Sequence, residues 1–506
     1  MKVSTKHERE WSGVLTSFQG GLDRSKPPFL MDGENLYDMT NFFYDPKTGY
    51  PTTRPPLKKY SASASGSGSP INGIFEMVIG GASTVLLTCE DGKIYYLDVN
   101  LDPQLIGSLT GSARPSFDQM NGKAVICSGG VLQTYNGTTL VSTTSPTMSY
   151  ISSHAKKDIA RIIGCGNSTF TDRVYLSGSN DPANWTFNAS PESDAKYFDA
   201  GYKDGLDSFG LASYMGDVFV FKKVPARGRR ATYRAIIIDT SANWSCRPLS
   251  SSHTSLSPHF IIEAGDVYFM DAEGPKRLSA VPSISEFPFA IEPYASNIAG
   301  ELRTFLSTDG FSIYDQAFGI IMTKPAKNSE LFYCMDLQGM RWNYFKFGVN
   351  IQSGCFINGK MIFGATDGFL YEYDMTGETN DEGLFYPSIE TKWFDIDFML
   401  RNQSKEKYLS IIGITAGSLS FMPKERGEAK YEFAVTKEFG EDWWSWPVVN
   451  SITPEQWTES LTKIKFDYLR DNNRVSADQL SFQITVTSGM CALGQLSARI
   501  AEVGRT

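Results

Sequence analysis

Residues 358–363 read Asn-Gly-Lys-Met-Ile-Phe, and residues 367–373 read Asp-Gly-Phe-Leu-Tyr-Glu-Tyr. Each stretch begins with an Asn-Gly or Asp-Gly step, which is followed at once by a run rich in apolar and aromatic residues. These dipeptides supply the positive φ angles of a type I′ turn, whose twist matches the strands that it joins. The two stretches therefore predict β-hairpins.

The same phrase recurs along the chain, at residues 91–97, 121–127, 216–221 and 265–270. Turn glycines at positions 92, 122, 216, 265 and 359 are separated by 30, 94, 49 and 94 residues. Each interval of 94 is twice 47, so we expect one weaker copy in each of these gaps, at residues 172–177 and 330–336. A period of about 40–50 residues with several strands per repeat is typical of a β-propeller blade.

Several of the predicted strands are apolar at consecutive positions, as in Val218-Phe219-Val220-Phe221. A strand with one solvated face would alternate apolar and polar residues, whereas a strand covered on both faces has no need to. Inner strands of propeller blades are covered in this way, and so are strands in an irregular β-sandwich, which is the alternative. We predict a mainly β protein with a β-propeller of about six or seven blades, an extended N-terminal segment and a C-terminal β-rich unit.

Three regions are expected. Residues 1–66 form an extended arm, because their prolines disfavour helices and central strands, and the Ser/Ala/Gly run at 61–69 is expected to be a flexible tether. Residues 67–376 form the propeller. Residues 377–506 form a β-sheet unit, since 463–468 and 480–486 alternate apolar and polar residues. This unit either completes the propeller or stands apart as a subunit-contact domain. Residues 453–456 carry the start signal of one short helix.

Composition narrows the class of protein. The 506 residues carry 47 basic and 56 acidic side chains, a net charge of −9, and 13% are aromatic. This excludes a basic nucleic-acid coat and a disordered chain. No secretion signal or membrane-spanning run is evident, and the seven cysteines are scattered and odd in number. We expect free thiols and synthesis in a reducing cytoplasm.

A search for chemistry finds little. The chain has four histidines and no phosphate-binding loop, zinc-protease motif, nucleophile elbow or complete dinucleotide fingerprint. Paired carboxylates such as Asp395 and Asp397 arise by chance among 56 acids. We therefore predict no catalytic residue, cofactor or metal site, and a protein that is not an enzyme.

Two clusters are candidate contact sites. A basic cluster on a predicted hairpin loop would contact DNA or a neighbouring subunit, unless it is simply a solvated loop: Lys222, Lys223, Arg227, Arg229, Arg230 and Arg234. A second cluster consists of Trp443, Trp444 and Trp446. Its rings are either core, a partner contact or a platform for sugars.

The N-terminal phrases, read together, resemble those of a known family. These are Gly20-Gly21-Leu22-Asp23, Pro27, Asp32-Gly33-Glu34, Asn41-Phe42-Phe43 and the run from Gly49 to Pro56. Their order is similar to the N-terminal stretch of packaged-DNA stabilisation or tail nozzle proteins of short-tailed bacteriophages. Residues 180–185 and 339–345 are similar to phrases in the propeller of such proteins.

The resemblance implies a structural protein of the virion tail, made in the host cytoplasm. Such a protein forms a homo-oligomeric ring, expected to be a hexamer, below the portal and adaptor proteins, where it retains packaged DNA and later lets it pass. Contact with DNA would be transient and non-specific, and the family has no catalytic residues to carry over. The alternative is a propeller-based tail receptor-binding protein or polysaccharide-degrading enzyme.

Overall fold

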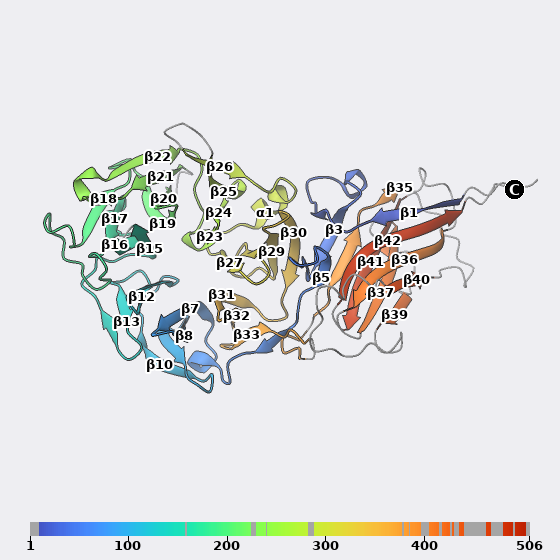
Figure 1. Ribbon diagram of the computed structural model, residues 1–506, viewed down its shortest axis with the longest axis horizontal. Helices are drawn as coiled ribbons and strands as arrows, with labels where there is room; N and C mark the ends of the chain where they lie inside the picture. The colour runs from blue at the N-terminus through green and yellow to red at the C-terminus, as the bar shows by residue number, and fades with distance from the viewer. Residues whose placement is uncertain are drawn as a thin grey trace, which may run out of the picture. The chain divides into compact units, whose positions relative to one another are not determined.

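The computed structural model describes residues 10–501 apart from 157–158, 224–228, 239, 282–287, 377–378, 384, 396–403, 414–416, 426–427, 430–434, 440–461, 467–478 and 489–490. The chain divides into two compact units (Figure 1). Residues 58–330 and 349–373 form the first, which we call the propeller unit. Residues 1–57, 331–348 and 374–506 form the second, which we call the sheet unit.

The fold is mainly β, with blades of four antiparallel strands that follow one another in chain order. Five blades are β7 (Ile71–Ile79) to β10 (Pro103–Ser108) with β8 (Ala82–Cys89) and β9 (Lys93–Leu97); β11 (Ser116–Met120), β12 (Lys123–Cys127), β13 (Gln133–Tyr135), β14 (Leu140–Ser142); β15 (Tyr150–Lys156), β16 (Ile159–Cys165), β17 (Arg173–Leu176), β18 (Lys196–Asp199); β19 (Asp207–Tyr214), β20 (Asp217–Lys223), β21 (Arg230–Ile236), β22 (Ser245–Ser250); and β23 (Ile262–Ala264), β24 (Asp266–Asp271), β25 (Gly274–Ala280), β26 (Phe289–Pro293).

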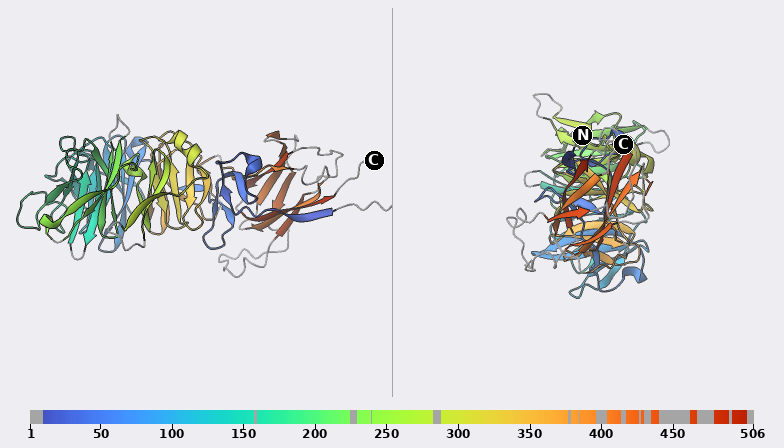
Figure 2. Two further views of the ribbon diagram at one scale, coloured as in Figure 1. Left: turned by 90° about the horizontal axis from the view of Figure 1, so that it is seen from above. Right: turned by 90° about the vertical axis from the view of Figure 1, so that its right-hand side faces the viewer.

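The sixth and seventh blades complete the propeller. They are β27 (Phe311–Asp315), β28 (Ile320–Lys324), β29 (Leu331–Asp336), β30 (Arg341–Lys346), and then β31 (Ile351–Ile357), β32 (Lys360–Ala365), β33 (Leu370–Tyr373) with β6 (Leu57–Lys59). The two outer strands of the sixth blade, β29 and β30, fall among the residues assigned to the sheet unit. The predicted propeller of about six or seven blades is confirmed, with seven. In the left view of Figure 2, the strands of the propeller unit run from one face of this unit to the other. The α-helix α1 (Ala299–Phe305) was not predicted.

Hairpin turns explain the uneven spacing of the glycines. Asn358 and Gly359 join the first two strands of the seventh blade with φ of 49° and 78°, as a type I′ turn requires. Gly122 and Gly216 mark the same turn in other blades, and Gly265 lies between the first two strands of the fifth blade. Gly92 instead marks the second hairpin of its blade, so the interval of 30 is not a blade length. The two copies expected in the gaps are present, and their marked segments are the third strands β17 and β29.

Hydrophobic cores lie between neighbouring blades. Val218 and Val220 of β20 pack in a cluster with residues of the third blade. Phe219 and Phe221, which alternate with them, pack in a different cluster with residues of the fifth blade. All four side chains are fully buried. The consecutive apolar run is therefore explained by a strand that is covered on both faces.

The seventh blade takes its outermost strand from the N-terminal region. β6 joins β33, so residues after 377 do not complete the propeller. The segment expected to be a flexible tether is fixed here: the amide of Tyr60 donates to the carbonyl of Leu370, the amide of Ser65 donates to the carbonyl of Gly368, and Ser65 is buried. The boundary between the units falls at 57/58, not near residue 66.

The sheet unit collects strands from both chain termini. Its strands from the N-terminal region are β1 (Glu10–Thr16), β2 (Gly21–Leu22), β3 (Asn35–Thr40), β4 (Phe42–Tyr44) and β5 (Pro51–Thr53). Those from the C-terminal region are β34 (Ser388–Thr391), β35 (Phe394–Asp395), β36 (Ser404–Gly413), β37 (Gly417–Glu425), β38 (Glu428–Ala429), β39 (Val435–Phe439), β40 (Thr462–Phe466), β41 (Gln479–Ser488) and β42 (Cys491–Ala501).

These strands interleave: β1 and β5 both pair with β42, and β3 pairs with β34, which pairs in turn with β41. The N-terminal region is therefore part of a sheet and not an extended arm. Of the alternating segments, 463–466 lies in β40 and 480–486 lies in β41, and residues 467–468 are outside the described residues. The short helix expected at 453–456 lies outside the described residues.

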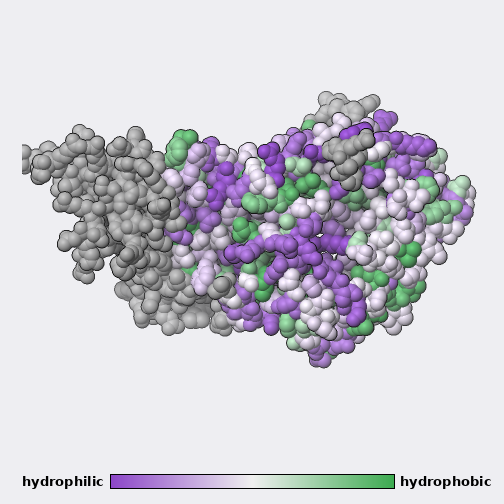
Figure 3. All heavy atoms as spheres, turned by 180° about the vertical axis from the view of Figure 1, so that it is seen from behind, coloured by the Kyte–Doolittle hydropathy of each residue, from purple (hydrophilic) through white to green (hydrophobic). Residues whose placement is uncertain are grey.

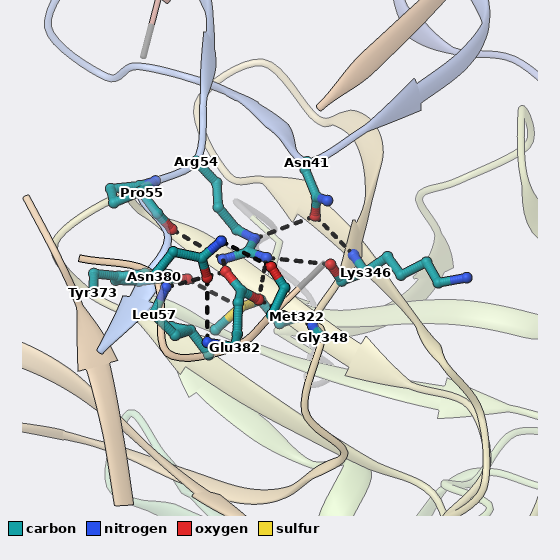
Figure 4. A network of polar contacts seen from close by, with 11 residues as sticks. Asn41, Arg54, Pro55, Leu57, Met322, Lys346, Gly348, Tyr373, Asn380 and Glu382 are labelled. Atoms are coloured by element: carbon teal, nitrogen blue, oxygen red, sulfur yellow. Dashed lines mark hydrogen bonds and ion pairs between the residues drawn. The ribbon is translucent and has the colours of Figure 1, made fainter. Parts of the chain in front are cut away.

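A buried ion pair joins three parts of the sheet unit (Figure 4). The guanidinium of Arg54 donates to both carboxylate oxygens of Glu382, at 2.9 and 2.8 Å, and neither side chain is exposed. Arg54 also donates to Asn41 Oδ1 at 3.2 Å and to the carbonyl of Lys346 at 3.2 Å. Glu382 accepts from the amides of Leu57 and Gly348, both at 3.1 Å. Every charged oxygen therefore has several donors.

We predict that Glu382→Gln lowers the free energy of unfolding by about 3–5 kcal/mol, because it leaves the Arg54 charge buried without a counter-ion. Chemical denaturation of the full chain measures this. Asp32→Asn is the matched control: the Lys26–Asp32 pair is exposed, with side-chain exposures of 46% and 75%, and its loss is expected to cost less than about 1 kcal/mol. Equal losses in the two variants would contradict the assignment.

Candidate functional site

The predicted basic cluster lies on the second hairpin of the fourth blade. Lys222 and Lys223 end β20, Arg229 directly precedes β21, and Arg230 and Arg234 lie on β21. Arg227 lies outside the described residues, as does the predicted aromatic cluster of Trp443, Trp444 and Trp446. The hairpin therefore accounts for five of the six predicted basic residues.

Lys222 is a core residue. Its ammonium group is fully buried and donates to both carboxylate oxygens of Asp204, at 2.9 and 3.0 Å, and to the carbonyl of Ala200. Asp204 also accepts a hydrogen bond from the hydroxyl of Tyr233 at 2.9 Å. A buried ammonium group held in this way is not available to DNA or to another subunit.

The other described cations on the strands are also engaged within the propeller unit. Lys223 donates to the carbonyl of Leu256 at 2.7 Å, Arg230 is ion-paired with Asp271, and Arg234 is ion-paired with Asp217 at 2.7 Å. Asp271 is itself buried and comes from the fifth blade, so the Arg230 pair joins neighbouring blades. Four of the five described cations of the cluster are therefore engaged within the propeller unit, and one of them, Lys222, is buried.

One cavity of about 440 Å³ opens beside this hairpin. Its polar lining includes Arg229, Arg230, Tyr233, Asp204 and three consecutive serines, 250–252. Arg229 is exposed, and no ion pair with it is found among the described residues. A cavity of this size with one free guanidinium suits a single acidic side chain or phosphate group better than a nucleic-acid duplex.

A chain of polar contacts links the inner strands of the blades. His154 Nδ1 on β15 lies 3.0 Å from Ser213 Oγ on β19, and the amide of Ser213 donates to Glu263 Oε1 on β23 at 2.9 Å. Asp118 on β11 is hydrogen-bonded to Ser153 on β15. The inner strand of a four-stranded blade has one edge that pairs with no other strand. These side chains form hydrogen bonds at that open edge.

Burial shifts the pKa of each of the three titratable groups in this series of contacts. It raises the pKa of Asp118, and it raises the pKa of Glu263 with a further contribution from the charge of Asp118. Burial and the charge of Lys156 lower the pKa of His154 to about 4. Only 3% of His154 is exposed, and its Nε2 has no hydrogen-bond partner among the described residues. A neutral imidazole is therefore strongly preferred at this position.

Sequence reasoning gave none of these inner-strand residues a role. Asp118, His154 and Glu263 are each single polar residues in a short strand, and they come together only because the first strands of successive blades are neighbours. A polar residue recurring within the first strand of several blades was the available signal. It becomes readable once the blade boundaries are known.

Metal ligation finds no support in the part of the chain that the structure describes, where no group of three or more His, Cys, Asp and Glu residues is placed to hold an ion. All seven cysteines are free thiols, as predicted, and burial raises the pKa of Cys127 and Cys491 to about 12. None of the described helices has the length and apolar character needed to cross a membrane.

Comparisons with known proteins report on the fold alone. No protein family and no curated protein matches the chain. Among solved structures, BBS1N in complex with ARL6DN is 8% identical and BamB from Moraxella catarrhalis is 12% identical. Both similarities cover 64% of this chain and 99% of the other, with TM-scores of 0.40 and 0.36. The computationally designed Ika8 protein is 13% identical, covering 63% of this chain and 100% of the other with a TM-score of 0.33.

We predict that Lys222→Met lowers the melting temperature by several degrees, because it leaves the carboxylate of Asp204 without its ammonium partner. Arg229→Ala is the matched control from the same hairpin, and it is expected to leave the melting temperature within about 1 °C because its side chain is exposed. Calorimetry of the full chain makes the comparison. The internal role of Lys222 is wrong if the two variants melt alike.

His154 gives a pH-dependent prediction. Its pKa is lowered from 6.5 to about 4, so its contribution to stability is full above pH 6.5 and is lost as the pH falls toward 4. The difference in unfolding free energy between the wild type and His154→Gln is expected to shrink over this range by up to about 3 kcal/mol. Lys156 and Asp217, the charged groups near the ring, are the same in both proteins. Parallel pH profiles would rule this out.

Proposed function

We propose that this chain is a structural virion protein that forms the ring, or nozzle, of a short phage tail, where it retains packaged DNA and provides a conduit for its ejection. In this proposal it has no catalytic turnover. It assembles with copies of itself, expected to number six, and with adaptor, portal and other tail proteins. The observation that carries the proposal is that the N-terminal phrases of the family resemblance contribute residues to close contacts inside the sheet unit.

Those phrases supply residues that the sheet unit is built around. Asn41 and Arg54 both belong to the buried Glu382 network. Gly21 has a φ of 72° and approaches the backbone of Trp342 so closely that a side-chain carbon there would lie 3.2 Å from the amide nitrogen of Trp342. Asp23 accepts from Ser25 and Asn35. Contacts of this kind restrict which residues can occupy these positions. We therefore take the short phrases as support for an architecture shared with the family.

Electrostatics is compatible with a passage for DNA. Each phosphate that a conduit neutralises adds affinity that slows passage, so a conduit benefits from few exposed cations. The net charge is −9, and most of the described cations of the fourth-blade hairpin are paired internally. The DNA path in this proposal runs between subunits of the ring, because side chains from different blades meet across the propeller axis. Arg114 of the second blade, for example, contacts Gln352 of the seventh and Phe311 of the sixth.

One observation favours the second candidate, a receptor-binding protein. The third blade carries an aromatic patch in which Arg173 is stacked between Phe170, at 4.5 Å, and Tyr197, at 3.9 Å. The two rings are 47% and 49% exposed, and Arg173 is ion-paired with Asp199 at 2.8 Å. Exposed rings beside a planar ion pair are able to stack on a sugar and hydrogen-bond its hydroxyls.

We predict that the purified full chain forms closed rings, seen as particles with an axial hole in negative-stain images and as one oligomer by light scattering. Arg229→Glu is expected to shift the protein toward smaller species if the fourth-blade cavity accepts an acidic group from a neighbour. Arg247→Glu, at another exposed arginine of the same blade, is the matched control. A protein that stays monomeric at high concentration and binds a glycan array, with binding lost in Tyr197→Ala, would favour the receptor-binding candidate instead.

A further inference from the structure

Arg114 reaches across the axis of the propeller unit at one mouth. It lies just before the first strand of the second blade, and it donates to the carbonyl of Gln352 on β31 of the seventh blade at 2.7 Å. Its guanidinium carbon is 4.1 Å from the ring centre of Phe311 on β27 of the sixth blade. On the face that Figure 3 shows, hydrophilic residues surround a small hollow near the centre of this unit.

The guanidinium is poorly satisfied by the protein. It has five N–H donors, and the carbonyl of Gln352 is the one hydrogen-bond acceptor found for it among the described residues. No described carboxylate oxygen lies within 4.0 Å of a guanidinium nitrogen of Arg114, the distance of an ion pair. The missing hydrogen bonds are costly because the guanidinium is removed from water by its neighbours, and this burial lowers the pKa of Arg114 to about 10. Partly buried charges of this kind are normally paired.

Several charged groups lie around Arg114. The carboxylates of Glu90 and Asp309 attract its charge and Lys324 repels it, while Lys327 is ion-paired with Glu90. The cations and the carboxylates also differ in environment. Lys324 is only 1% exposed, whereas Glu90 and Asp309 are both exposed and therefore screened by water. The mouth of the axis is thus a positive site in an acidic protein.

We propose that this mouth binds one small oxyanion, held by the guanidinium of Arg114. A planar guanidinium forms two parallel hydrogen bonds with a carboxylate or a phosphate, which matches the donors left over here. Phosphate in solution and the carboxylate of an acidic side chain share this chemistry. The inference is independent of the proposed tail function and of the fourth-blade cavity.

Titration of the full chain with inorganic phosphate, sulfate or acetate, with chloride at matched ionic strength as reference, tests the site. A saturable rise in melting temperature is expected with at least one oxyanion, since a ligand that binds only the folded state stabilises it. Arg114→Met is expected to remove the effect, and Arg247→Met, at an exposed arginine elsewhere, to retain it. A response to phosphate and sulfate alone would indicate an inorganic ligand, and a response that includes acetate would indicate a carboxylate.

Arg114→Lys keeps the charge but not the planar fork, so it is expected to weaken binding at least tenfold and to serve if Arg114→Met does not fold. Isothermal titration of the wild type with phosphate gives the affinity directly. The proposal is overturned if the wild type shows no saturable binding of phosphate, sulfate or acetate up to 10 mM, or if binding persists unchanged in a folded Arg114 variant.

Discussion

The fold depends on strands that bury both of their faces. β20 illustrates the constraint: its valines pack toward the third blade and its phenylalanines toward the fifth. A single blade cannot satisfy such a strand, because one face would remain in water at a cost of about 25 cal/mol for each Å² of apolar surface. Each blade therefore requires a neighbour on either side, and the arrangement is complete only when the last blade meets the first. The cluster that joins residues of β7 and β8 with residues of β31 to β33 makes that last contact.

Closure explains the arrangement of the N-terminal region. β6 is the outermost strand of the seventh blade, so a segment from near the start of the chain is held beside one that lies more than 300 residues later. Leu57, the first residue of β6, donates its amide to Glu382, which is paired with Arg54. The buried ion pair therefore fixes the chain just before it enters the propeller. This position accounts for the number of donors around Glu382, since a buried charge is tolerated only when its hydrogen bonds are satisfied.

Much of the fold was accessible from the sequence because its signals are local. Type I′ turn residues, such as Asn358 and Gly359, and consecutive apolar positions in β20 require no knowledge of distant residues. The predicted tether was wrong, and the burial of Lys222 in the basic cluster was missed, because both depend on distant partners. Ser65 is small and polar, yet it is held by Gly368, and Lys222 reaches Asp204 in a loop before the blade's first strand. Nothing in a Lys-Lys-Val-Pro segment indicates that its first lysine is buried.

Electrostatics separates five arginines and lysines of the propeller unit into two groups. Lys222, Arg230 and Arg234 have carboxylate partners, so their charges are cancelled within the fold. Arg114 and Arg229 have none among the described residues, although one lies at the axis and the other beside a cavity. In a chain with nine excess negative charges, an unpaired arginine in a concave site attracts anions over a distance of about 8–10 Å at physiological salt. The proposed anion sites therefore lie at two separate arginines, whereas the sequence alone suggested one continuous basic loop.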